Sequence, residues 1–168
     1  MADAMLPPET LARAPKVLHA LRMQGWMLVT AESCTGGLIA AALTSVAGSS
    51  DVFNRGFVTY SNCAKTQMLG VAHELIVRHG AVSEHVARAM AEGALANSSA
   101  QIAISVTGIA GPGGGSARKP VGLVWFAWAI AGATTAVSHV FPGDRAAVRA
   151  ACVDIAFNLL CAAAQRDI

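Results

Sequence analysis

The hydrophobic positions of this chain fall into strand-like and helix-like segments that alternate along the sequence. Short, nearly continuous apolar runs predict strands that are buried on both faces of a sheet. These runs lie at residues 26–31, 53–60, 101–106 and 121–141. The last run has a turn-like patch at 131–135, so it predicts a hairpin of two strands. The intervening segments predict helices at residues 11–24, 38–46, 61–69, 72–79 and 84–97, and a last helix that Asp144 caps.

This order of elements predicts an α/β fold. Helices that alternate with strands cover both faces of a sheet, and we expect a three-layer α/β/α sandwich. The hairpin makes the sheet of about five strands mixed rather than wholly parallel. A length of 168 residues favours one domain, 1–168, in which residues 1–8 are expected to form a loose tail.

Charge is scarce, and this narrows the possible partners. Hydrophobic residues make up 54% and charged residues 13%, with a net charge of +2. Without a basic run, no nucleic-acid partner is expected. Residues 120–143 carry no charge and are long enough to span a bilayer, but the turn-like patch favours a buried hairpin. A small membrane protein is the weaker alternative.

Cysteine use and the N-terminus point to the cytoplasm. The four cysteines show no C-x-x-C spacing, so reduced thiols are expected. Asp3, Pro7, Pro8 and Glu9 interrupt any leader-like pattern at the N-terminus. No cluster has metal-ligand spacing, and we expect neither a metal nor a cofactor.

Two loops that follow predicted strands carry hydroxyl groups. Ser33 begins one loop and Thr107 the other, and both face one crevice if their strands are parallel neighbours. Ser33 at a helix start suits a nucleophile, although an ordinary helix cap explains it equally simply. Lys65 is the preferred base over five dispersed histidines, and its alternative is an exposed helix lysine. Arg145, in the first turn of the last helix, suits an anion or is merely solvated.

Several longer motifs carry a family resemblance. They are AESCTGG at 31–37, VTYSN at 58–62 followed by Lys65, VTGIAGPGGG at 106–115 and KPVG at 119–122. Together they resemble the CinA C-terminal domain family, over about residues 10–165. Larger members also carry an N-terminal nucleotide-pyrophosphatase domain, for which this chain has no room, so it is similar to the stand-alone form.

The resemblance implies a cytoplasmic, homodimeric amidohydrolase. It would convert nicotinamide mononucleotide to nicotinic acid mononucleotide and ammonia. Ser33 would be the nucleophile and Lys65 its base, with Tyr60 and Thr107 completing the catalytic set. The expected substrate contacts are Thr35, Gly36, Gly37, Gly108, Gly111, Gly113 and Arg145. The alternative is a non-catalytic nucleotide-binding module of the competence or damage-inducible type, which would need no serine–lysine pair.

Overall fold

The computed structural model describes residues 5–165 of the chain. Its helices are α1 (Pro8–Leu11), α2 (Ala14–Met23), α3 (Leu38–Thr44), the 3-10 turn η1 (Ser49–Asp51), α4 (Asn62–Leu69), α5 (His73–His79), α6 (Glu84–Ala96) and α7 (Arg145–Ala164). Its strands are β1 (Leu28–Glu32), β2 (Phe53–Val58), β3 (Ile102–Gly108), β4 (Leu123–Ile130) and β5 (Ala133–Val140).

The five strands form one mixed sheet in the order β2-β1-β3-β4-β5. Strand β1 pairs in parallel with β2 and with β3, whereas β3, β4 and β5 are antiparallel. Strand β1 lies between β2 and β3. The connection that leaves the carboxyl end of β1 leads to β2 on one side of β1, and the connection that leaves β2 leads to β3 on the other side. Open α/β sheets bind ligands at such a switch point. The predicted crevice between β1 and β3 is therefore present.

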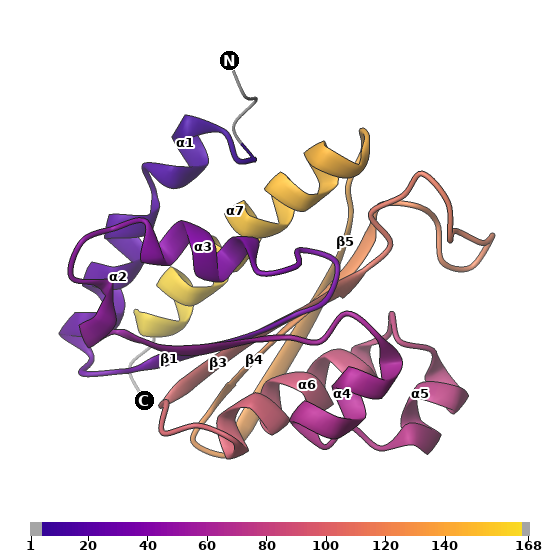
Figure 1. The fold of residues 1–168 in the computed structure, drawn as a ribbon, viewed down its shortest axis with the longest axis horizontal. Coiled ribbons are helices and arrows are strands. Elements are labelled where there is room, and N and C mark those ends of the chain that lie inside the picture. The colour runs from indigo at the N-terminus through magenta and orange to yellow at the C-terminus, as the bar shows by residue number, and fades with distance from the viewer. Residues whose placement is uncertain (1–4, 166–168) are drawn as a thin grey trace.

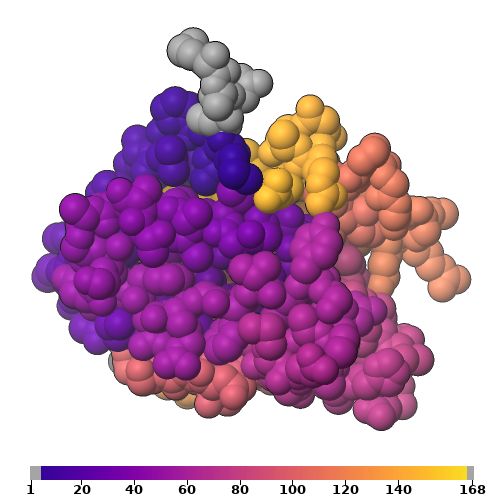
Figure 2. Space-filling view, in the orientation of Figure 1, coloured from indigo at the N-terminus to yellow at the C-terminus, as the bar shows by residue number. Residues whose placement is uncertain are grey.

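Helices cover both faces of the sheet, which confirms the three-layer fold (Figure 1). Helices α1, α2, α3 and α7 lie on one face, and α4, α5 and α6 lie on the other. The loop of residues 109–122, between β3 and β4, projects from the body beside the N-terminal end of α7 (Figure 2). This placement brings the glycine-rich loop and the last helix to the same edge as the switch point.

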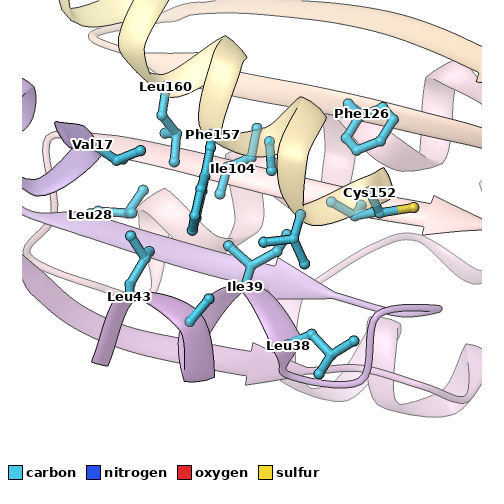
Figure 3. Close-up of a cluster of buried hydrophobic side chains, with 14 of the residues drawn as sticks. Val17, Leu28, Leu38, Ile39, Leu43, Ile104, Phe126, Cys152, Phe157 and Leu160 are labelled. Carbon is cyan, nitrogen blue, oxygen red and sulfur yellow. The ribbon is translucent and has the colours of Figure 1, made fainter. Parts of the chain in front are cut away.

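The two faces of the sheet are packed with side chains of different size. Large residues fill the α7 face, where Phe157 and Leu160 meet Leu28 and Ile104 (Figure 3). Because successive strand residues point to opposite faces, the small side chains of β3 and β4 face α6. The alanines that meet there are Ala87, Ala91 and Ala94 of α6 and Ala103, Ala127 and Ala129 of the strands. This surface lets α6 approach the sheet closely.

A glycine fixes the position of helix α4 on α6. A Cβ atom on Gly93 would lie 1.9 Å from the backbone oxygen of Leu69, the last residue of α4. Only glycine permits this contact between the two helices. Since α4 carries Lys65, the approach of α4 to α6 also places the predicted base.

Two expectations from the sequence are wrong. The hairpin turn comprises only Ala131 and Gly132, both with positive φ, while residues 133–135 already pair in β5. The expected loose tail is ordered where it is described, because Leu6 is buried against the core and α1 begins at Pro8. Residues 1–4 of that tail lie outside the described residues.

The uncharged stretch at 120–143 forms the β4–β5 hairpin rather than a membrane helix. Within residues 5–165, one helix, α7, is long and apolar enough to cross a membrane by length and composition. Its buried residues, among them Val148 and Phe157, pack against the sheet. Core helices of ordinary globular domains share this composition.

Candidate active site

Three parallel strands deliver the predicted catalytic residues to one edge of the sheet. Ser33 follows β1 directly, Thr107 lies at the end of β3, and Lys65 is in α4, just after β2. Glu32 of β1 is in register with Val58 of β2 and with Val106 of β3, so the three strand ends meet. A cavity of about 200 Å³ opens there, lined by Ser33, Cys34, Tyr60, Asn62, Lys65, Ala81, Val82, Thr107, Gly108, Ala110 and Arg145.

The Lys65 side chain is buried beside Ser33. Lys65 is only 1% exposed, and its Nζ lies 3.0 Å from the Ser33 hydroxyl oxygen. Its other partners are the carbonyl oxygens of Thr59 at 2.8 Å and Tyr60 at 3.4 Å. No described Asp or Glu forms an ion pair with it. Burial lowers the pKa of Lys65, because the ammonium form loses its hydration.

These three contacts suit either protonation state of the Lys65 amine. An ammonium donates to both carbonyls and to the Ser33 hydroxyl oxygen. A neutral amine has two N–H donors for the Thr59 and Tyr60 carbonyls and turns its lone pair to the Ser33 hydroxyl proton. Lowering the pKa increases the neutral fraction, so the site can support proton transfer from Ser33 to Lys65.

A buried carboxylate holds the helix that follows Ser33. Glu32 is 1% exposed, and its Oε2 accepts the backbone N–H groups of Gly37 (3.1 Å) and Ile39 (3.0 Å). Its Oε1 accepts the N–H of Ala40 at 2.9 Å. Carboxylates at helix N-termini satisfy otherwise unpaired donors and suit the helix dipole. Sequence reasoning missed this role, although an acidic residue at a strand end just before a helix was the available signal.

The Glu32 cap engages the backbone of one of the two glycines that are expected to contact the substrate. The N–H of Gly37 is bonded to Glu32, and the N–H of Gly36 is bonded to the Ser33 carbonyl at 3.0 Å. Neither donor is free for an oxyanion or a phosphate. The N–H groups of Cys34 and Thr35 have no acceptor among the described residues. The donors nearest to Ser33 are therefore those of the two residues that follow it.

Tyr60 and Thr107 both line the cavity but hold different positions. Tyr60 is 60% exposed, and its hydroxyl accepts a bond from Arg145 at 2.8 Å, so it is the backbone of Tyr60 that contacts Lys65. Thr107 is buried, and its hydroxyl donates to the Ala81 carbonyl at 2.9 Å. With that proton engaged, the Thr107 oxygen retains lone pairs that can accept an N–H.

The remaining predicted contacts separate into two groups. Gly108 lines the cavity, and the carbonyl of Gly111 accepts a bond from Arg145 at 3.0 Å. A Cβ on Gly108 would lie 2.6 Å from Cγ2 of Val124, which explains the need for glycine. Gly113 is exposed and Thr35 is fully buried, and neither residue lines this cavity or the larger one beside it.

A larger cavity of about 640 Å³ adjoins the first. It is lined by Ala110, Pro112, Val121, Gly143, Asp144, Arg145, Ala146 and Arg149, and it shares Ala110 and Arg145 with the Ser33 cavity. Arg149 was not predicted from the sequence, because its spacing from Arg145 is that of ordinary helix neighbours. Within residues 5–165, no group of three His, Cys, Asp or Glu side chains is arranged to hold a metal ion.

The sequence of the chain matches a known protein family. The family model of the CinA C-terminal domain matches residues 11–164. The chain belongs to the CinA C-terminal domain family. Nicotinamide-nucleotide amidohydrolase PncC of Escherichia coli strain K12 is 53% identical over 146 residues, which cover 86% of this chain and 88% of that protein. PncC of Enterobacter agglomerans is 56% identical over 77% of this chain and 80% of its own length.

Solved structures agree with this assignment to the CinA family. The competence/damage inducible protein CihA from Agrobacterium tumefaciens is 47% identical, with a TM-score of 0.91. The match covers 97% of this chain and 99% of that one. The predicted family and fold class are thus confirmed.

Proposed function

We propose that this protein hydrolyses the carboxamide of nicotinamide mononucleotide, releasing ammonia and nicotinic acid mononucleotide. Two relatives more than 50% identical over most of the chain carry the name nicotinamide-nucleotide amidohydrolase. The observation that carries the proposal is the Lys65 amine, buried without an acidic partner 3.0 Å from the Ser33 hydroxyl. A module that only binds a nucleotide needs no amine beside the Ser33 hydroxyl. The Ser33–Lys65 pair therefore favours an enzyme over the regulatory alternative.

In the proposed mechanism Ser33 is the nucleophile and Lys65 the general base. Neutral Lys65 takes the hydroxyl proton while the Ser33 oxygen attacks the carboxamide carbon. The N–H groups of Cys34 and Thr35 would stabilise the oxyanion, each typically worth roughly 3–4 kcal/mol in such sites. The Lys65 ammonium then returns the proton to the leaving nitrogen, and ammonia departs.

Hydrolysis of the acyl-enzyme restores the site. Water attacks the ester of Ser33 with Lys65 again as base, and the product is the carboxylic acid. The Thr107 oxygen, whose own proton is engaged by Ala81, would accept an N–H of the carboxamide. That bond orients the amide so that its carbon, rather than its nitrogen, faces Ser33.

The test is ammonia release from nicotinamide mononucleotide. Wild-type protein should release it, and Ser33→Ala or Lys65→Met should lose on the order of 10⁴-fold or more in kcat. Cys34→Ala is the matched control, because it alters the neighbouring side chain but keeps the backbone N–H. Ammonia release by Ser33→Ala at the wild-type rate would contradict the proposal.

A further inference from the structure

The larger cavity carries arginine side chains that the chemistry at Ser33 does not use. Arg145 and Arg149 both line it, one turn apart on α7. The only other charged side chain in the lining is Asp144, whose carboxylate caps α7 by accepting the Ala147 N–H at 2.9 Å. Neither arginine forms an ion pair with a described acid. The cavity is thus positively charged on balance.

The two guanidinium groups are held in place by neutral oxygens. Arg145 donates to the Gly111 carbonyl and to the Tyr60 hydroxyl. Arg149 donates from Nη2 to the Thr35 carbonyl at 3.1 Å, while its Nε is buried and has no partner among the described residues. These bonds engage only some of the five N–H donors of each guanidinium group, so further donors remain for an anion in the cavity.

The position of Arg149 connects the cavity to the nucleophile. Thr35, to which it donates, is two residues after Ser33, and a Cβ on Gly36 would lie 3.5 Å from the Arg149 Nη2. The cavity itself adjoins the Ser33 cavity through Ala110 and Arg145. A ligand with its reactive group at Ser33 can therefore extend into the larger space. Its volume, about 640 Å³, lies in the usual range for small-molecule sites.

We propose that the larger cavity is the phosphate subsite and that Arg149, with Arg145, binds the phosphate of the nucleotide. Planar guanidinium groups bind phosphate oxygens through paired N–H bonds, and arginine is the preferred residue for this. The inference rests on the proposed function and adds to it a requirement for the phosphate of the substrate. The enzyme requires a 5′-phosphate, and Arg149 is the residue that distinguishes the mononucleotide from its riboside.

The first experiment compares two substrates. Kinetic constants for nicotinamide mononucleotide and nicotinamide riboside are measured for wild type, Arg149→Gln, Arg149→Lys and the control Arg118→Gln, which removes a charge from the exposed loop. Arg149→Gln should raise KM for the mononucleotide roughly 10- to 100-fold and reduce its preference over the riboside by a similar factor. Arg149→Lys should restore part of the preference, and Arg118→Gln should retain it. If Arg149→Gln weakens both substrates in proportion, Arg149 has a structural role and the subsite assignment is wrong.

A second experiment separates this inference from the proposed reaction. Binding of ribose 5-phosphate is measured by calorimetry, with ribose as the control. Wild type should bind the phosphate ester, and Arg149→Gln should weaken it by about tenfold or more. That result supports the phosphate subsite whether or not the wild type releases ammonia. Absence of ammonia release would overturn only the deamidase proposal. Equal binding to wild type and Arg149→Gln would overturn the subsite while leaving the deamidase proposal intact.

Discussion

The burial of Lys65 predicts an unusual dependence of stability on pH. Burial lowers the pKa of the folded-state amine, whereas in the unfolded chain it has the ordinary value of about 10.4. Between the two pKa values the unfolded chain binds more protons than the folded one. The free energy of unfolding therefore rises with pH across this window. For one group the slope is at most about 1.4 kcal/mol per pH unit.

Replacing Lys65 by methionine isolates this contribution. Methionine has similar length and no titratable group, so Lys65→Met should lack the part of the slope that Lys65 supplies. The variant also leaves the Thr59 and Tyr60 carbonyls without their donor, a cost that does not change with pH. That cost lowers the free energy of unfolding of Lys65→Met by the same amount at every pH. It therefore does not affect the slope of the free energy of unfolding against pH. The stability of the variant relative to wild type should therefore fall steadily as the pH is raised.

The assay is urea unfolding at a series of pH values from 6 to 10 for wild type and Lys65→Met. Lys16→Met serves as control, because Lys16 lies exposed on α2 and should leave the wild-type slope unchanged. The same lowered pKa predicts that kcat/KM of the wild type rises with pH to a plateau, as Lys65 becomes neutral. Parallel stability curves for wild type and Lys65→Met would refute the claim that burial lowers the pKa of Lys65.

Three further predictions concern the groups around the site. Glu32→Gln should destabilise the protein by about 1.5–3 kcal/mol in urea unfolding, because an amide cannot accept at both of its ends; unchanged stability would show that the cap is dispensable. Cys34→Ala should retain ammonia release, because the Cys34 thiol has no part in the proposed reaction, whereas loss of turnover would make Cys34 the nucleophile. Gly93→Ala, normally stabilising in a helix by up to about 1 kcal/mol, should instead destabilise through contact with the Leu69 oxygen, and a rise in Tm would contradict this.

The alternation of apolar segments was sufficient to predict the layers and the order of the strands and longer helices. The first helix, expected over 11–24, is divided into α1 and α2. Buried strands on both faces leave near-continuous apolar runs, and helix caps such as Ser83 and Asp144 mark the helix starts. The turn at 131–132 was placed less well, because Thr134 and Thr135 suit both a turn and a strand. Leu6 was misjudged because a single apolar residue between polar and proline neighbours shows no periodicity.

The site was only partly predictable for a different reason. Ser33 and Thr107 could be brought together from their places at strand ends, because parallel neighbours share one edge. Lys65 was preferred as the base before the family resemblance entered, because the five histidines are dispersed along the chain. Its burial could not be predicted, since it depends on how α4 packs against α6. The role of Arg149 depends on a contact with the Ser33 loop, 114 residues away in the sequence, and no local pattern carries that information. Glu32 lies five residues before Gly37, so its place at a strand end before a helix was a local signal that sequence reasoning missed.

The central claim is that Ser33 forms a covalent acyl intermediate with the nicotinamide nucleotide. Rapid acid quench of wild-type protein during turnover, followed by digestion and mass spectrometry, tests it directly. The account predicts an adduct equal in mass to the nucleotide less ammonia on the peptide containing Ser33, located on the serine and absent from Ser33→Ala. An adduct on Cys34, or steady ammonia release by Ser33→Ala, would contradict it.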